Sequence, residues 1–178
     1  MAGSKTLSFI KQFLKHPGQV GALTPSGKGL VNAMVKPIDF DKAREIVELG
    51  PGTGPVTRVL LKRMHPDARL NVVEINAEFC EQLREIGDKR LNVIHGDASK
   101  LSKLVPKADC VISGLPIVNF PKELTAAILD EIAKIAPMYI QFNYSTLAEK
   151  VLRKRFKKVT RKVVLLNVPP AVVYTVTV

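Results

Sequence analysis

Tryptophan is absent from this 178-residue sequence, which also contains only two cysteines and three histidines. Two cysteines cannot build a disulfide framework, so Cys80 and Cys110 are expected to be free thiols of a cytoplasmic protein. There is no H-x-x-H or C-x-x-C pair, so we expect no metal site. No apolar run approaches the ~18–20 residues of a membrane-spanning helix. A secretory signal is not expected either, because Lys11 and Lys15 interrupt the apolar stretch near the start.

Acidic residues are scarce relative to basic ones. The sequence has 16 acidic and 27 basic residues, which gives a formal net charge of +11. Such an excess favours a polyanionic partner, such as nucleic acid, an anionic membrane surface or an acidic protein, without choosing among them. The charge is uneven, because residues 1–36 contain five lysines and no acid, and residues 149–162 contain eight basic residues against one acid.

Short β-like runs alternate with longer helical stretches, which predicts a parallel sheet with crossover helices. The expected strands are 45–49, 69–74, 92–95, 109–113, 138–143, 158–167 and 172–178. The expected core helices are 55–64, 77–87, 124–135 and 145–156. The last two strands are too close for a helical crossover and should be antiparallel. We therefore predict an α/β fold with a Rossmann-like, seven-stranded, mostly parallel sheet, helices on both faces and an antiparallel last strand. We expect a single domain, in which an N-terminal extension of residues 1–36 precedes a core of 37–178.

The strongest local signal is the segment Glu48-Leu-Gly-Pro-Gly-Thr-Gly54, which lies between an expected strand and an expected helix. Its glycines permit a tight turn and let the backbone approach a ligand that a Cβ atom would repel. The spacing is G-x-G-x-G, whereas dinucleotide-binding folds use G-x-G-x-x-G. No Lys-Ser/Thr pair follows, so the segment is not a phosphate-binding P-loop.

Three acids, Glu48, Glu74 and Asp97, are expected at the carboxyl ends of the first three strands. These ends meet at one edge of a parallel sheet, where ligands bind in open α/β folds. Glu74 is placed to accept hydrogen bonds from the ribose hydroxyls of a nucleoside, and Asp97 to accept one from an adenine amine. The alternative, three solvated loop acids, is weaker because all three occupy matching strand ends.

Together these segments resemble class I S-adenosylmethionine-dependent methyltransferases. The resemblance implies the cofactor S-adenosyl-L-methionine, with the ELGPGTG loop and the following strand ends as its site. The residues so implied are Glu48, Gly50, Gly52, Thr53, Gly54, Glu74, Ile75, Asp97, Ala98, Ser113 and Gly114. The rival interpretation of the glycine-rich turn is a nicotinamide-dependent dehydrogenase.

The segment SGLPIVN (113–119) bears on the substrate. Methyltransferases that act on adenine amines carry an N/D-P-P-Y/F or N-L-P-Y motif here, whose aromatic ring stacks on a flipped base. This chain keeps the Leu-Pro pair but has Ile117 where the aromatic residue should be. The ribosomal RNA adenine dimethyltransferases are therefore relatives at most, and we do not expect nucleic acid as the partner. An rRNA adenine or RNA-binding methyltransferase is kept as the alternative function.

A finer resemblance covers essentially the whole chain. VGALTPSGKGLVNAM (20–34), SGLPIVN, QFNYS (141–145) and LNVPPAVVY (166–174) are similar to segments of bacterial phospholipid N-methyltransferases of the Rossmann-fold type. The resemblance implies methylation of a phospholipid amine, phosphatidylethanolamine toward phosphatidylcholine, at a membrane surface. Close relatives methylate ornithine lipids, which gives a second candidate substrate.

Methyl transfer from a sulfonium needs little acid–base help, so orientation of the amine should dominate. Tyr144 and Asn119, expected at the ends of the fifth and fourth strands, are the candidate catalytic residues that position the amine. Candidates for holding the lipid phosphate precede or begin a helix expected at 27–35. They are Thr24, Pro25, Ser26 and Lys28. Ser26 could equally be a plain N-cap of this helix.

Residues 5–15 have an apolar stripe of Leu, Ile and Phe opposite a face of lysines. This pattern predicts an amphipathic helix in a membrane interface, or alternatively a helix packed on the core. The basic run 149–162 would attract anionic lipid, or would simply be a solvated helix face. We therefore expect a cytoplasmic protein that is peripheral on the inner face of the membrane, where an anionic surface and a phospholipid are its partners. The oligomeric state is not determined by the sequence.

Overall fold

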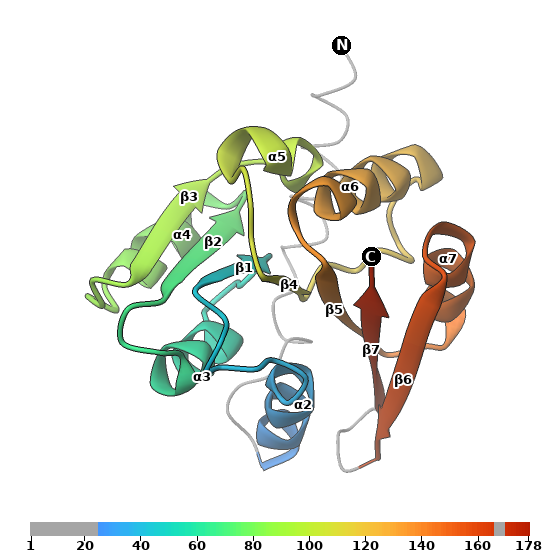
Figure 1. The fold of residues 1–178 in the computed structure, drawn as a ribbon, viewed down its shortest axis with the longest axis horizontal. Helices are drawn as coiled ribbons and strands as arrows, with labels where there is room; N and C mark the ends of the chain where they lie inside the picture. Colours follow the sequence, from blue (N-terminus) through green and yellow to red (C-terminus); the bar gives the residue numbers. More distant parts are fainter. Residues whose placement is uncertain (1–24, 166–169) are drawn as a thin grey trace.

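The computed structural model describes residues 25–165 and 170–178 (Figure 1). They form a seven-stranded sheet in the order β3-β2-β1-β4-β5-β7-β6. The strands are β1 (Glu45–Leu49), β2 (Arg69–Glu74), β3 (Leu91–His95), β4 (Cys110–Ser113), β5 (Met138–Asn143), β6 (Lys158–Val164) and β7 (Ala171–Thr177). Strands β1 to β5 are parallel, and β7 is antiparallel to both of its neighbours. The predicted fold class is confirmed.

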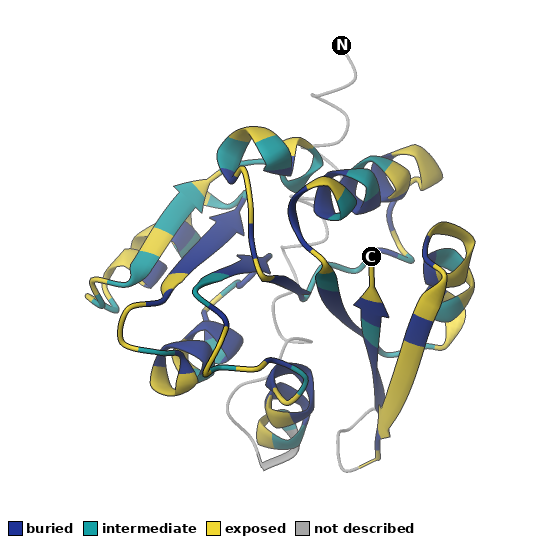
Figure 2. Ribbon diagram, in the orientation of Figure 1, coloured by how far each residue is buried: buried dark blue, intermediate teal, exposed yellow. Residues whose placement is uncertain are grey.

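Helices cover both faces of the sheet (Figure 1). They are α2 (Pro25–Val35), α3 (Pro55–Arg63), α4 (Ala77–Arg84), α5 (Leu101–Leu104), α6 (Lys122–Ile135) and α7 (Leu147–Arg155), with a 3-10 turn η2 (Ala98–Lys100) before α5. One buried cluster contains side chains of α2, α3 and α4, and the other contains side chains of α5, α6 and α7. Figure 2 shows the central strands buried, whereas the edge strands β3 and β6 are largely exposed or half-buried.

Several element boundaries differ from the sequence prediction, and one helix was missed. Helix α4 ends at Arg84, because Gly87 adopts a left-handed φ of 68° just beyond it. Helix α6 begins at Lys122, directly after Pro121, whose fixed φ suits a helix start. The missed segment is η2 with α5, a single turn too short to show helical periodicity. Strand β6 ends at Val164 instead of 167, and α7 covers 147–155 instead of 145–156.

The pairing register brings the functional ends of the strands to one edge of the sheet. Leu49 of β1 pairs with Val73 of β2 and with Ser113 of β4, and Glu74 pairs with His95 of β3. Because β7 is antiparallel to β5 and to β6, strand β6 runs in the same direction as β5. The carboxyl ends of β1 to β6 therefore lie along one edge, which we call the carboxyl edge.

The segment predicted as an amphipathic helix, 5–15, lies outside the described residues, as does Thr24. None of the helices described here combines the length and the hydropathy needed to cross a membrane.

Candidate functional site

The turn from β1 into α3 depends on three glycines in the left-handed region. Gly50, Gly52 and Gly54 have φ values of 64°, 56° and 82°. A Cβ atom on Gly50 would lie 2.6 Å from Cδ2 of Leu115, so a larger residue there would have to displace that side chain. A Cβ atom on Gly52 would meet nothing within 4 Å. Gly52 therefore presents backbone to open space, as a ligand-binding turn should, while the neighbouring Thr53 is exposed at the tip.

The carboxylate of Glu74 is held against this turn by backbone donors. Its Oε2 accepts a hydrogen bond from the N–H of Gly52 at 3.2 Å, and its Oε1 accepts from the N–H groups of Ile75 and Asn76, both at 2.9 Å. Burial raises the pKa of Glu74, although these three backbone bonds oppose the rise. A carboxylate oxygen can accept two hydrogen bonds, so Oε2 keeps capacity for a further donor such as a hydroxyl.

Asp97 lies next to Glu74 at the end of β3. The N–H of Gly96 donates to the Glu74 carbonyl at 2.9 Å, which joins the two strand ends. Oδ1 of Asp97 accepts from the N–H of Ser99 at 2.9 Å and caps η2, whose first residue is Ala98. Its Oδ2 makes no hydrogen bond within the described part of the chain, so one oxygen of a half-buried carboxylate is available to a ligand.

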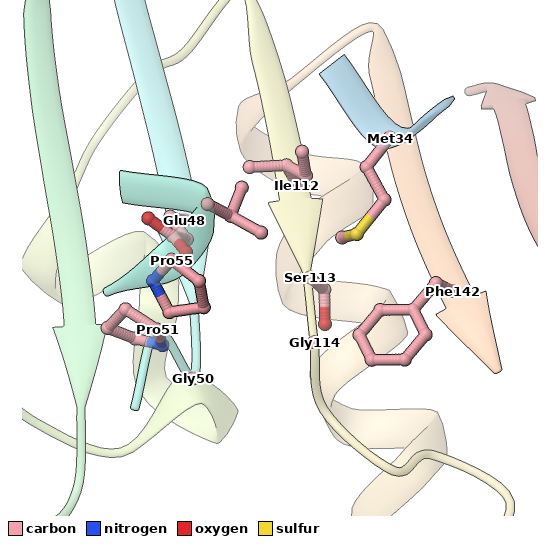
Figure 3. Close-up of a pocket in the computed structure, with 10 residues that line it drawn as sticks. Met34, Glu48, Gly50, Pro51, Pro55, Ile112, Ser113, Gly114 and Phe142 are labelled. Carbon is pink, nitrogen blue, oxygen red and sulfur yellow. The ribbon is translucent and has the colours of Figure 1, made fainter. Parts of the chain in front are cut away.

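A cavity of about 20 Å³ lies between the ends of β1, β4 and β5 (Figure 3). Four of the residues lining it were predicted for the cofactor: Glu48, Gly50, Ser113 and Gly114. Six were not: Met34, Pro51, Pro55, Val56, Ile112 and Phe142. Figure 3 shows Met34 of α2 and Phe142 of β5 beside Ser113. Met34 reaches the cavity because α2 packs on the sheet, and Phe142 because β5 pairs with β4; no local sequence signal reports either arrangement.

Glu48 is a buried carboxyl at this cavity. Thr57 Oγ1 donates to its Oε2 at 2.7 Å. Burial raises the pKa of Glu48 to about 7, and the nearby Glu74 charge adds to the rise, while the hydrogen bond from Thr57 opposes it. Near neutral pH the side chain is therefore partly protonated, and a cation placed in the cavity would favour its ionised form.

Of the two residues predicted to position the amine, one lies beside the cavity wall. The half-buried Tyr144 meets Phe142 edge-on, with ring centroids 5.6 Å apart. Asn119 is exposed, its N–H donates to the carbonyl of Pro116 at 2.9 Å, and it does not line the cavity. The structure therefore links Tyr144, but not Asn119, to the cavity through a direct neighbour.

Ile117 is 1 % exposed and belongs to the buried cluster under α6. Its carbonyl accepts a hydrogen bond from Thr125 Oγ1 at 2.8 Å, which fixes the loop on α6. The position at which base-methylating enzymes carry a stacking ring is thus turned into the core.

The predicted phosphate-binding segment is only partly described. Helix α2 starts at Pro25, so Ser26 lies in its first turn and is not the N-cap, which corrects that alternative. Lys28 is exposed. A Cβ atom on Gly29 would lie 3.9 Å from Val164 Cγ1, so the start of α2 lies beside the end of β6.

Sequence reasoning missed Gln141, a fully buried amide in the apolar strand β5. Its Nε2 lies 2.9 Å from the carbonyl of Leu115 and 3.1 Å from Oδ1 of Asn143, and its Oε1 accepts from the hydroxyl of Tyr139. Gln141 therefore ties the loop after β4 to the end of β5. The available signal was a polar residue inside MYIQFN.

The sequence profile of the family described as ribosomal RNA adenine dimethylase matches residues 27–166. The chain belongs to this family of class I S-adenosylmethionine-dependent methyltransferases. It is 36 % identical over 177 residues to an ornithine lipid N-methyltransferase from Singulisphaera acidiphila, which covers 93 % of this chain and 92 % of that protein. It is 29 % identical to ribosomal RNA small subunit methyltransferase A from Mycoplasma capricolum, over 72 % of this chain but 48 % of that protein.

The fold of this methyltransferase matches that of N-methyltransferase NodS from Bradyrhizobium japonicum in complex with S-adenosylhomocysteine. The TM-score is 0.69 at 11 % identity, and the match covers 87 % of this chain and 88 % of NodS. The predicted class and the cofactor S-adenosylmethionine are confirmed. The open backbone at Gly52 and the remaining acceptor capacity of Glu74 fit such a cofactor. Over the residues that the structure describes, no group of His, Cys, Asp or Glu could hold a metal ion.

The glycine turn gives a first prediction. Gly52→Ala and Gly87→Ala both place a Cβ atom on a residue with positive φ, at 56° and 68°, so each should lose roughly 1–2 kcal/mol of stability. Only Gly52→Ala places that atom in the open space beside Glu74, so only this variant should bind S-adenosylhomocysteine more weakly. Calorimetric titration and urea unfolding of both variants test this. Equal cofactor affinity in the two variants would contradict a binding role for Gly52.

The pKa of Glu48 gives a second prediction. Because this pKa is higher in the folded protein than its usual value of 4.5, the folded state binds more protons between pH 4.5 and 7. The free energy of unfolding should therefore fall as pH rises through this window, with Glu48 accounting for up to about 3 kcal/mol. Glu48→Gln keeps an acceptor for Thr57 and should remove that part of the pH dependence.

Urea unfolding of the wild type and of Glu48→Gln at pH 5 and pH 8 measures the effect. The exposed Glu123 supplies the control, because Glu123→Gln should leave the wild-type pH dependence unchanged. Parallel pH profiles for wild type and Glu48→Gln would show that Glu48 is not the titrating group.

Proposed function

We propose that this methyltransferase transfers the methyl group of S-adenosylmethionine to the primary amine of a membrane lipid headgroup, at the inner face of the membrane. The observation that carries the proposal is the similarity to an ornithine lipid N-methyltransferase, which extends over 93 % of this chain and 92 % of the relative. The buried Ile117 supports it, because it leaves no ring at the usual place for stacking on a base.

The adenosine half of the cofactor is assigned to the ends of β2 and β3. Oε2 of Glu74 would accept a hydrogen bond from a ribose hydroxyl, and Oδ2 of Asp97 one from the adenine amine. Ile75 and Ala98 follow these acids directly and would border the base. The open face of Gly52 gives the nucleoside room beside Glu74.

The methionine half is assigned to the region beside Glu48, Gly50, Ser113 and Gly114, where the cavity of about 20 Å³ would have to widen to hold it. The cofactor supplies an activated methyl group on a positively charged sulfur. Glu48 would become ionised when that charge and the cofactor's ammonium lie nearby, because opposite charges lower a carboxyl pKa. The lipid amine must approach in its neutral form, in line with the methyl carbon. Orientation therefore dominates, and Tyr144 beside Phe142 is the candidate to provide it.

Two headgroups offer a suitable primary amine. The resemblance of segments 20–34 and 166–174 implies phosphoethanolamine as the acceptor. The relative that is 36 % identical is an ornithine lipid N-methyltransferase, which favours ornithine lipid. Both are zwitterionic headgroups that carry an ammonium beside an anionic group. Lys28, exposed in the first turn of α2, is the described candidate for that anionic group.

Ribosomal RNA is the second candidate substrate. The family profile and the small subunit methyltransferase relatives favour it, as does the net charge of +11. The core position of Ile117 weighs against it, and the alignment with the Mycoplasma capricolum relative covers 48 % of that protein.

A methyl-transfer assay decides between these substrates. Purified protein and methyl-labelled cofactor are incubated in parallel with vesicles containing phosphatidylethanolamine, vesicles containing ornithine lipid, amine-free phosphatidylglycerol vesicles and ribosomal RNA. Label is expected in one or both amine lipids and not in phosphatidylglycerol, because that lipid has no nucleophilic nitrogen. Label in RNA alone would refute the lipid proposal.

Glu74→Gln tests the assigned cofactor site. Losing the charge weakens the hydrogen bond to ribose, and such a bond contributes roughly 1.5–3 kcal/mol, so affinity for S-adenosylhomocysteine should fall on the order of tenfold or more. Glu78→Gln is the matched control, because Glu78 is an exposed carboxyl in the first turn of α4 near the same strand end. Calorimetric titration measures both affinities. Wild-type affinity in Glu74→Gln would remove Glu74 from the site.

A further inference from the structure

Four large hydrophobic side chains are exposed in the described part of the chain. They are Leu147, Val163, Leu165 and Val178, which are 67 %, 49 %, 75 % and 44 % exposed. Val178 follows β7 at the opposite edge of the sheet, where its N–H donates to the carbonyl of Pro137 just before β5. The other three, Leu147, Val163 and Leu165, lie at the carboxyl edge.

Strand β6 runs in the same direction as β5, with β7 between them. Val163 pairs with Val172, and Val172 pairs with Asn143, the last residue of β5. Val163 therefore lies at the level of the end of β5, which Tyr144 directly follows in the sequence. Leu165 lies two residues further along and therefore extends beyond this level. Figure 2 shows β6 as an exposed strand at the margin of the sheet.

Helix α7 begins with Leu147 shortly after β5 ends at Asn143, so Leu147 lies at the carboxyl edge too. The helix returns over β6, as the ion pair between Arg161 and Oε2 of Glu149 shows at 2.6 Å. Leu147 lies two residues before Glu149, and Val163 lies two residues after Arg161 on the same face of β6. Both are therefore on the carboxyl-edge side of that ion pair. We call Leu147, Val163 and Leu165 the apolar rim.

The rim is bordered by unneutralised positive charge. The one acid of segment 149–162, Glu149, is used by Arg153 and Arg161, and Arg155 pairs with Asp130. The lysines of the segment have no acidic partner among the residues that the structure describes: Lys150, Lys154, Lys157, Lys158 and Lys162. Two of them lie near the rim, Lys150 in the first turn of α7 and Lys162 next to Val163, whereas Lys158 begins β6 and pairs with Thr177 at the opposite edge. Lys28 adds a further exposed charge beside the end of β6.

We propose that the apolar rim and its flanking lysines dock the methyltransferase on an anionic lipid bilayer, with the carboxyl edge facing the membrane. Apolar side chains enter the interface and lysines attract anionic headgroups, the combination that holds peripheral proteins on membranes. The inference deepens the proposed function and rests on it, since a lipid amine must reach the cavity at this edge. RNA is the less suitable partner, because binding of single strands uses exposed aromatic rings and Phe156, the ring within the basic segment, is buried.

The experiment compares two double variants with matched controls. Leu147→Asn with Leu165→Asn removes two of the apolar side chains, and Lys150→Gln with Lys162→Gln removes the charge beside them. Val178→Asn and Lys62→Gln are the controls, because Val178 is an exposed apolar residue and Lys62 an exposed lysine away from the rim. Co-sedimentation uses vesicles of phosphatidylglycerol with phosphatidylcholine and vesicles of phosphatidylcholine alone, at low and high salt. Melting temperatures verify that each variant folds.

The apolar double variant should bind phosphatidylglycerol vesicles on the order of tenfold more weakly at both salt concentrations, because burial of apolar area is not screened. At low salt the lysine variant should bind these vesicles more weakly than the wild type. At high salt the two should bind alike, because salt screens the attraction of the wild-type lysines too. Controls should bind as the wild type. Wild-type vesicle binding by the apolar variant overturns the proposal. So does a lysine variant that loses affinity for ribosomal RNA in a gel shift but keeps vesicle binding.

Methyl transfer to amine lipid dispersed in detergent micelles separates this inference from the proposed function. If the wild type methylates micellar lipid while rim variants still bind vesicles normally, the docking surface is wrong and the lipid function stands. If vesicle binding requires the rim but no amine lipid is methylated in micelles or vesicles, the docking surface stands and the substrate assignment fails.

Discussion

The hydrogen bond from the Gly52 N–H to Glu74 Oε2 joins the two parts on which this site depends, the glycine turn after β1 and the end of β2. The turn can reach Glu74 only because its three glycines adopt left-handed φ values, which side chains would oppose. In turn, Gly50 leaves room for Leu115, so the loop after β4 closes over the same turn. One local backbone conformation therefore sets the positions of three strand ends.

The site contains two buried carboxyls, Glu48 and Glu74, whose ionised forms are disfavoured when no ligand is bound. Burial raises the pKa of both Glu48 and Glu74, and neither forms an ion pair with a basic side chain of the described chain. Such groups reduce stability near neutral pH, so they are expected at functional positions rather than structural ones. A cofactor that brings positive charge and hydroxyl donors to this edge would satisfy both carboxyls together.

The direction of β6 adds a second property to the carboxyl edge. Because β7 lies between β5 and β6 and is antiparallel to both, β6 ends at the edge where the cavity lies. The exposed side chains of Leu147, Val163 and Leu165 therefore lie on the same side of the molecule as the cavity. A soluble substrate requires no such surface, whereas a substrate held in a bilayer requires that the cavity approach the membrane.

The sequence by itself determined the sheet, the glycine turn and the acids at the strand ends, because period-two and helical patterns and glycine spacing are local properties of the chain. It could not show that Met34 and Phe142 line the cavity, that Ile117 is buried under α6, or that Gln141 joins two loops. It also missed α5, which is a single turn. These features arise where segments distant in sequence pack together. Only the tertiary structure decided them, because packing and hydrogen bonding between such segments depend on strand order and helix placement.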